Sequence, residues 1–254
     1  MHIFKSLMIA FSIYSKIPVP QFEWKDEDMK YMLCFFPWIG AVIGICLFGW
    51  SRLCDCIGVG EICRTLMGGA IPLIITGGFH VDGFMDTMDA FHSYRTKEEK
   101  LEILKDPHIG AFSVIMLAVY GMLYLGAFSE VTDTGLLKLV CAGFFLARCL
   151  SGLSVVSFPP AKEGGMLFLF ADSAGRKVVK WTLCFQGLAC IAYMLLQAPR
   201  AGILVASAAL VVFLGYYRRT KKELGGITGD TAGWFVLLSE GAMMLVAAII
   251  NQMI

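Results

Sequence analysis

The feature that most constrains this chain is a series of long apolar runs separated by short polar segments. Six runs approach or exceed the roughly 17–25 residues that cross the hydrocarbon core of a bilayer; they cover 31–53, 109–128, 136–158, 181–197, 202–217 and 234–251. A seventh run, 66–79, is shorter and is interrupted by Pro72 and by glycines. Such broken segments often lie at binding sites, because irregular backbone is tolerated in a membrane only where protein or water covers it. We expect a single all-α domain over 1–254, a polytopic membrane bundle of about seven transmembrane segments.

Composition supports this expectation and excludes other classes of protein. Only 16% of the residues are charged and 57% are hydrophobic, whereas soluble domains carry about 25% charged residues. The net charge of +1 gives no basic field for nucleic acid. Most of the nine cysteines lie within the apolar runs, where cysteine acts as a small hydrophobe rather than as part of a disulfide framework. Residues 1–20 end in Ile-Pro-Val-Pro rather than at a cleavage site, so they predict an interfacial or partly inserted helix.

The distribution of basic residues predicts the orientation of the chain. Seven crossings place four polar segments on one side of the membrane, namely 1–30, 80–108, 159–180 and 218–233. These segments hold sixteen of the 21 lysines and arginines. By the positive-inside rule they face the cytoplasm. We therefore expect a multi-pass protein of the cell membrane with a cytoplasmic N-terminus and an active site that faces the cytosol.

An acidic stretch, GGFHVDGFMDTMDAF at 77–91, stands out against the apolar background. In a helix, Asp82, Asp86 and Asp89 occupy positions i, i+4 and i+7 and point along one face within about 60° of each other. Three carboxylates on one stripe repel unless a cation neutralises them. Mg²⁺ suits this pattern, since it binds through one or two carboxylates plus substrate phosphates and waters. Gly83 removes a side chain beside Asp82 and would allow a ligand to approach the backbone.

Two other interpretations of the acidic stretch remain open from the residues alone. A solvated amphipathic stripe would pair its acids with the lysines that follow at 97–105. A proton or cation pathway in a transporter would also use acidic residues. Ionisable groups beside a membrane segment are functional by default, which favours a metal-and-phosphate site over the solvated stripe.

Further polar groups fall on the same predicted side. The GGITGD stretch at 225–230 precedes the last apolar run, and glycines with free N–H groups at a helix start form an anion cradle. Asp230 is an N-cap or a further metal ligand. Arg148 lies within an apolar run and needs an anionic partner, either an acid or a substrate phosphate. We expect phosphate or nucleotide to contact the following residues: Arg148, Lys162, Gly225, Gly226, Thr228 and Gly229.

These motifs resemble the cobalamin synthase family. The family pattern Gly-Gly-x-His-x-Asp-Gly-x-x-Asp-x-x-Asp is met at 77–89, and a Lys/Arg-Asp-x-x-x-Gly segment is met by Lys105, Asp106 and Gly110. SKIPVP, FFPWIGAVIG, LAR and GGITGDTAG follow the family in order along the whole chain. Ala90 stands where the family usually has glycine, and Pro107-His108 where Ser-Arg is common. These departures leave the acids intact.

The resemblance implies a Mg²⁺-dependent integral membrane transferase. It would join adenosylcobinamide-GDP to α-ribazole, or to α-ribazole 5′-phosphate, and release GMP. It implies metal binding by Asp82, Asp86, Asp89 and Asp230, substrate binding by Lys105, and catalytic roles for Asp89, His80 and Asp106. We expect Asp89, or failing that His80, to take the proton from the attacking hydroxyl. Homo-oligomerisation is left open, and the lipid bilayer is the expected surroundings.

Two rival functions make different predictions. A CDP-alcohol phosphotransferase would carry Asp-x-x-Asp-Gly-x-x-Ala-Arg with two further aspartates, whereas here Asp-Gly comes first and Arg148 is far away in sequence. A proton-coupled transporter would carry inverted internal repeats, and the aspartate motif has no second copy in the chain. The sequence therefore favours a transferase that acts on a diphosphate.

Overall fold

The computed structural model describes residues 2–20, 22–162 and 175–253, which fold into helices joined by short turns. The chain enters through α1 (His2–Tyr14), α2 (Asp26–Met29), η1 (Met32–Cys34), α3 (Phe36–Ile57), α4 (Glu61–Thr76) and α5 (Phe79–His92). It continues through α6 (Lys97–Ile103), α7 (Ala111–Ser129), α8 (Thr134–Ser157), α10 (Arg176–Gln197), α11 (Pro199–Leu224) and α12 (Gly229–Asn251). An isolated parallel bridge joins Pro160 to Ile227. The expected all-α fold is confirmed.

Six of the helices are long and apolar enough to cross a membrane, namely α3, α7, α8, α10, α11 and α12. The seventh predicted run forms α4, which begins at Glu61, earlier than the run itself. Two consecutive glycines, Gly77 and Gly78, have φ angles of 65° and 80°, which glycine adopts without steric penalty. They turn the chain by 93° into α5, so α4 and α5 count as a seventh span only if the bent pair is taken together.

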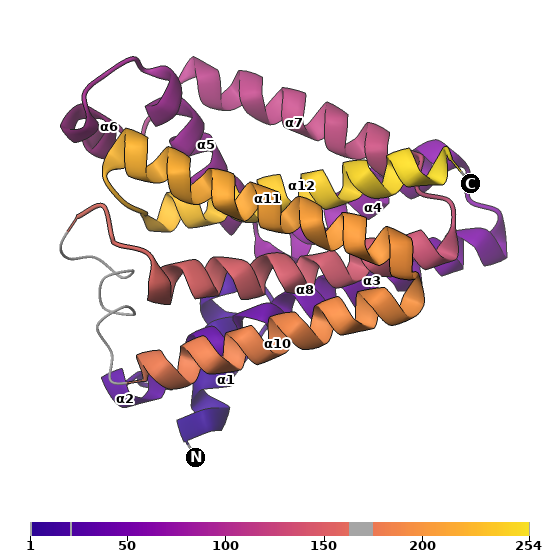
Figure 1. Ribbon diagram of the computed structural model, residues 1–254, viewed down its shortest axis with the longest axis horizontal. Helices are drawn as coiled ribbons and strands as arrows, with labels where there is room; N and C mark the ends of the chain where they lie inside the picture. The colour runs from indigo at the N-terminus through magenta and orange to yellow at the C-terminus, as the bar shows by residue number, and fades with distance from the viewer. Residues whose placement is uncertain (1, 21, 163–174, 254) are drawn as a thin grey trace.

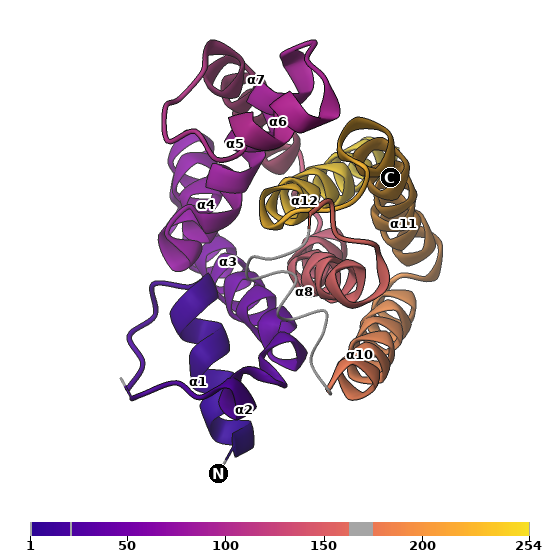
Figure 2. The ribbon, with the colours of Figure 1, turned by 90° about the vertical axis from the view of Figure 1, so that its left-hand side faces the viewer.

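Helix α8 occupies the centre of the bundle, with α3, α10 and α12 packed around it (Figure 2). Its contact with α3 is close because Gly40 and Gly44 lie against the α8 backbone. A Cβ on Gly40 would meet the carbonyl oxygen of Phe144 at 2.2 Å, and one on Gly44 would meet that of Cys141 at 2.4 Å. This Gly-x-x-x-Gly spacing is a common way for membrane helices to approach, and it explains the glycines of FFPWIGAVIG.

The polar segments gather at one end of the bundle. Figure 1 shows α6, the turn between α11 and α12, and α2 at the left end, whereas the C-terminus lies at the opposite end. The connections from α7 to α8 and from α10 to α11 also lie at the opposite end (Figure 1). Segments distant in sequence therefore meet where the aspartate motif and the GGITGD turn lie, as the alternation of basic segments predicts.

Candidate active site

The aspartate motif forms helix α5, as its spacing predicts. Asp82 is exposed, and Asp86 and Asp89 are half-buried along the same face. The rest of the helix packs into the bundle through its buried residues, which are His80, Gly83, Phe84, Thr87, Met88, Ala90 and Phe91. The predicted acidic stripe is therefore present at the edge of the protein interior.

Two glycines bring α5 and α12 into backbone contact. A Cβ on Gly83 would lie 2.8 Å from the carbonyl oxygen of Asp230, and one on Gly233 would lie 3.2 Å from that of His80. The space beside Gly83, where the sequence predicted room for a ligand, is thus filled by the backbone of α12. The close approach of the two helices places Asp86 near other negative charges, and it interacts unfavourably with Asp82, Asp230 and Asp89. The crossing adds the fourth expected carboxylate to the stripe.

Asp89 differs from its neighbours in being hydrogen-bonded to the start of α7. Its Oδ2 accepts the backbone N–H of Gly110 at 2.8 Å, and its Oδ1 accepts that of Ser113 at 2.9 Å. These amides have no partner inside their own helix, so the carboxylate caps α7 from a different element. A Cβ on Gly110 would lie 2.4 Å from the Asp89 carboxylate. The glycine that ends the Asp-x-x-x-Gly segment is therefore needed because Asp89 packs against it.

The carboxylates form an open set rather than a closed metal cage. In the part of the chain that the structure describes, no three His, Cys, Asp or Glu side chains converge closely enough to hold a metal ion by themselves. A structural zinc or calcium site would need such convergence. Mg²⁺ needs less, because it keeps several waters and takes substrate phosphates as ligands. Asp82, Asp86 and Asp230 fit that ion through their chemistry, and Asp89 retains lone pairs beyond its two amide bonds.

Two glycines of the GGITGD turn, Gly225 and Gly226, are required by the fold itself rather than by a ligand. Gly225 ends α11 with a φ of 82°, and a Cβ on Gly226 would meet Pro159 and Pro160 within 2.6 Å. Thr228 caps α12, accepting the Thr231 N–H, and its hydroxyl lies 3.4 Å from Asp230 Oδ2. Only part of the expected anion cradle remains available.

This available part is at the helix start. A Cβ on Gly229 would meet nothing within 4 Å, so a ligand has room to approach the first turn of α12. The N-terminus of this long helix favours an anion through its dipole. Gly229 is therefore the member of the turn best placed for the predicted phosphate contact.

Of the two lysines expected to bind substrate, one lies near the carboxylates and the other does not. The exposed ammonium of Lys162 lies close enough to Asp230 to act on it electrostatically, at the edge of the carboxylate group; residues 163–174, which follow it, lie outside the described ranges. Lys105 is paired with Glu102 at 2.5 Å on the exposed segment after α6. Among the described residues, no hydrogen bond or ion pair joins Lys105 to the aspartate stripe.

Asp106 lies on the same exposed segment as Lys105. Its Oδ1 accepts the backbone N–H of His108 at 3.0 Å and lies 2.6 Å from that residue's ring nitrogen Nδ1. These contacts hold the pKa of the Asp106 carboxyl below its ordinary value. A carboxylate with a lowered pKa is a weak proton acceptor, so its local contacts favour a role in shaping the loop.

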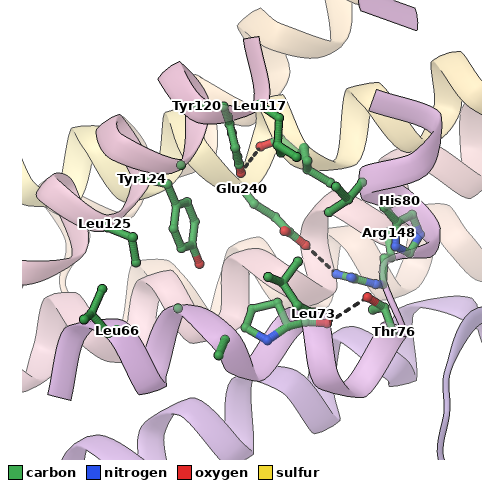
Figure 3. A pocket seen from close by; sticks show the side chains of 16 residues that line it. Leu66, Leu73, Thr76, His80, Leu117, Tyr120, Tyr124, Leu125, Arg148 and Glu240 are labelled. Carbon is green, nitrogen blue, oxygen red and sulfur yellow. Dashed lines mark hydrogen bonds and ion pairs between the residues drawn. The ribbon is translucent and has the colours of Figure 1, made fainter. Parts of the chain in front are cut away.

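Arg148 is bonded inside the protein to an acid. Its Nη1 donates to Glu240 Oε1 at 2.6 Å and to the carbonyl oxygen of Phe144 at 2.9 Å. Of the two partners left open by the sequence, the structure supplies the acid. The pair lies on the wall of a cavity that also contains His80, Tyr120 and Tyr124 (Figure 3).

One basic group near the site, Lys16, was not predicted from the sequence. A groove of about 660 Å³ runs between α1, the α4–α5 bend and α5, and Lys16 and Asp82 both line it. The Lys16 stem packs on Gly77, where a Cβ would lie 2.3 Å from Lys16 Cε, and its backbone N–H donates to the Ile75 carbonyl at 2.8 Å. The SKIPVP motif was the available signal, because it carries this lysine, but nothing in the sequence showed that it docks on the bend.

Comparison with known proteins tests the resemblance. A family model described as cobalamin-5-phosphate synthase matches residues 6–248. A protein of Lachnoclostridium phytofermentans named adenosylcobinamide-GDP ribazoletransferase is 42% identical over 236 residues, which are 92% of this chain and 90% of that relative. A protein of Alkaliphilus oremlandii with the same name is 33% identical over 256 residues, 98% of this chain and 99% of the relative.

A relative of the same name from Clostridium perfringens strain SM101 is 29% identical over 248 residues, 97% of this chain and 98% of the relative. No solved structure matches the fold. The matches run along nearly the whole chain, through both the aspartate motif and the GGITGD turn. The expected resemblance is confirmed: the chain belongs to the cobalamin-5-phosphate synthase family.

Proposed function

We propose that this chain is an adenosylcobinamide-GDP ribazoletransferase that acts at the polar end of a membrane-embedded helical bundle. It transfers the adenosylcobinamide phosphate group to the 5′-hydroxyl of α-ribazole, or of α-ribazole 5′-phosphate, and releases GMP. The observation that carries this proposal is the glycine crossing of α5 and α12, which sets Asp230 beside Asp82 and Asp86. A diphosphate donor needs such a group of acids, because its charge must be balanced by a cation that the acids hold.

The residues divide into distinct roles. Asp82, Asp86 and Asp230 would hold Mg²⁺, which would supply positive charge against the negative charge that develops on the phosphoryl oxygens. Asp89 fixes α7 to α5 and so holds the acidic stripe in register. Lys16, in the groove beside Asp82, and Lys162, near Asp230, supply positive charge for the departing phosphate.

The groove between α1 and α5 suits the diphosphate of the donor. Its volume of about 660 Å³ falls within the usual range for ligand sites. It holds Lys16 and Asp82 on facing elements, together with the hydroxyl of Ser12. Basic and hydroxyl groups bind phosphate oxygens, and the carboxylate lies where a bound metal would meet them.

The reaction proceeds as one in-line displacement. The 5′-hydroxyl oxygen forms a bond to the phosphorus attached to cobinamide, and the bond from that phosphorus to the bridging oxygen of GMP breaks. The hydroxyl proton passes to a carboxylate of the stripe, and GMP leaves with the bridging oxygen. Among the described hydrogen bonds no Ser-His or Cys-His pair occurs, which argues against a covalent enzyme intermediate.

Release of GMP tests the proposed function. The protein purified in lipid nanodiscs, given adenosylcobinamide-GDP and α-ribazole with Mg²⁺, should release GMP in equal amount to the cobalamin product. Without α-ribazole, GMP release should fall to background, because the hydroxyl is the attacking group. GMP release that does not depend on α-ribazole would show a hydrolase and contradict the proposal.

Removal of divalent ions tests the role of the acids. Chelation should abolish GMP release, and added Mg²⁺ should restore it, because the acids hold the metal only together with substrate phosphate and therefore weakly. A sample treated with chelator already saturated with Mg²⁺ is the matched control. Full turnover after chelation would contradict a metal-dependent reaction.

A further inference from the structure

A second cavity adjoins the groove, with which it shares part of its lining. Its volume is about 230 Å³, and α4, α5, α7, α8 and α12 all contribute to its walls. Most of the lining is apolar, as Figure 3 shows for Leu66, Leu73 and Leu125. At one end the lining becomes polar, where His80, Arg148 and Glu240 come together. The function proposed above does not use this cavity.

The polar end of the cavity is electrically balanced. The Arg148 guanidinium is bonded to Glu240 at 2.6 Å, and these side chains are only 1% and 7% exposed. A buried pair of opposite charges leaves little net field, and breaking it to bind an ion would strand a buried charge. The cavity therefore fits an uncharged ligand rather than a phosphate or another anion.

Hydrogen-bonding groups on the wall lack partners. His80 is 4% exposed, and within the described part of the chain neither of its ring nitrogens has a hydrogen-bond partner, nor does Arg148 Nε. Buried polar groups in native proteins are normally paired. A neutral imidazole carries one N–H and the Nε of arginine carries another. The N–H donors of His80 and Arg148, two residues of the cavity wall, therefore lack an acceptor that a ligand could supply.

We propose that this cavity binds the benzimidazole base of α-ribazole, and this inference rests on the proposed function. The base is a flat, uncharged, largely apolar bicycle, and its free ring nitrogen accepts one hydrogen bond, which the N–H of His80 donates. An apolar cavity of about 150 Å³ holds one benzene, so this cavity has room for the base and excludes a corrin ring. An acyl chain of a lipid would fill the apolar part and leave the donors unpaired.

The position of the cavity lets a bound nucleoside reach the groove. Leu73, Thr76 and Val81 line both the cavity and the groove that contains Asp82. His80 and Asp82 lie two positions apart on α5, so they point to different sides of the helix. A base beside His80 therefore places its ribose at the shared wall, with the 5′-hydroxyl directed toward the carboxylates.

A cavity-filling substitution with a matched control tests this assignment. Gly121 lies one turn from Leu117 and Tyr124 on the cavity face of α7, and a Cβ there would meet nothing within 4 Å. Gly121→Leu should fill the cavity and raise the KM for α-ribazole about tenfold or more, while the KM for adenosylcobinamide-GDP stays unchanged. Gly126→Leu is the control, because Gly126 is exposed on the same helix, also has open space, and does not line the cavity.

A direct binding measurement covers the case in which a variant folds poorly. Dimethylbenzimidazole, the base of α-ribazole without its ribose, should bind wild-type protein in nanodiscs in an equilibrium titration. It should also inhibit the reaction competitively against α-ribazole. His80→Phe keeps the ring that stacks on Phe36 at 5.6 Å but loses the donor, so it should weaken this binding several-fold with little change in thermal stability.

The outcomes separate this inference from the proposed function. If the wild type releases GMP but Gly121→Leu leaves the KM for α-ribazole at the wild-type value, the base lies elsewhere and the inference is wrong. Equal binding of dimethylbenzimidazole to wild type and to His80→Phe would overturn the role of His80. A wild type that binds the free base yet releases no GMP would contradict the proposed function alone.

Discussion

At the scale of single residues, the three carboxylates on α5 differ in their surroundings. Asp82 and Asp86 lie among other negative charges, so folding brings like charges together at a cost. Asp89 accepts two backbone N–H groups at the start of α7, so folding gives it favourable partners. Substitution of these residues should therefore change stability in opposite directions, although each should reduce activity.

Asparagine variants measure this difference. Asp82→Asn and Asp86→Asn should lower kcat by about 100-fold or more, because they remove charge from the metal site, and should leave the Tm equal or higher. Asp89→Asn keeps one acceptor oxygen and loses the other, which costs about 1 kcal/mol of stability, so its Tm should fall. Turnover assays and thermal unfolding in nanodiscs give both quantities. Unchanged turnover in all three variants would remove the carboxylates from the mechanism.

The sequence identified the polar and charged residues that lie within or beside apolar segments, but it did not predict what they contact. Arg148 was expected to have an anionic partner, and the choice between an acid and a phosphate stayed open. Glu240 lies 92 positions away, and only the packing of α8 against α12 brings the two together. His80 belonged to the right motif, yet its unpaired nitrogens depend on walls contributed by other helices. Contacts between residues so far apart in the sequence cannot be predicted from the spacing of residues within one segment.

At the scale of helices, the approach of α5 to α12 depends on having no side chain at Gly83. A Cβ there would meet the backbone of Asp230 at 2.8–3.2 Å, and backbone cannot rotate away as a side chain can. Gly83→Ala should therefore push the helices apart, lower the Tm by the equivalent of about 1–3 kcal/mol, and reduce kcat by separating the carboxylates.

A matched glycine controls for the effect of alanine itself. Gly126→Ala adds the same methyl group to an exposed helical position with open space. Alanine favours helix by about 1 kcal/mol over glycine, so this variant should keep wild-type activity and an equal or higher Tm. Equal behaviour of the two variants would show that the α5–α12 contact tolerates a side chain and does not set the site.

Helix positions were predictable to different degrees for physical reasons. The six long helices follow from apolar length alone, since a bilayer core fixes the number of residues needed. The short run at 66–79 was ambiguous because its end depends on backbone angles rather than on hydropathy. Gly77 and Gly78 both adopt positive φ, and the resulting bend separates α4 from α5. A pair of glycines marks a break in a helix, but their spacing does not give the angle.

At the scale of the whole molecule, the number of crossings decides where the C-terminus lies. α4 starts at the end of the bundle opposite the polar end, α5 completes the return of the chain to the polar end, and the C-terminus lies at the opposite end (Figure 1). Seven crossings with a cytoplasmic N-terminus put the C-terminus outside the cell. If the α4–α5 pair were re-entrant, six crossings would put both termini in the cytoplasm.

Reporter fusions distinguish these topologies. Alkaline phosphatase folds only outside the cytoplasm of a bacterial host, because it needs disulfides, and green fluorescent protein exported in the unfolded state does not become fluorescent. Phosphatase fused after Ile254 should be active, and phosphatase fused within the α11–α12 turn should be inactive, with the fluorescent fusions giving the opposite pattern. An active phosphatase in the turn would place the carboxylates on the outer face, away from the cytosolic nucleotide that the proposed reaction requires. The positive charge of Lys16, Lys162 and the segment 218–222 makes the cytoplasmic placement the expected result.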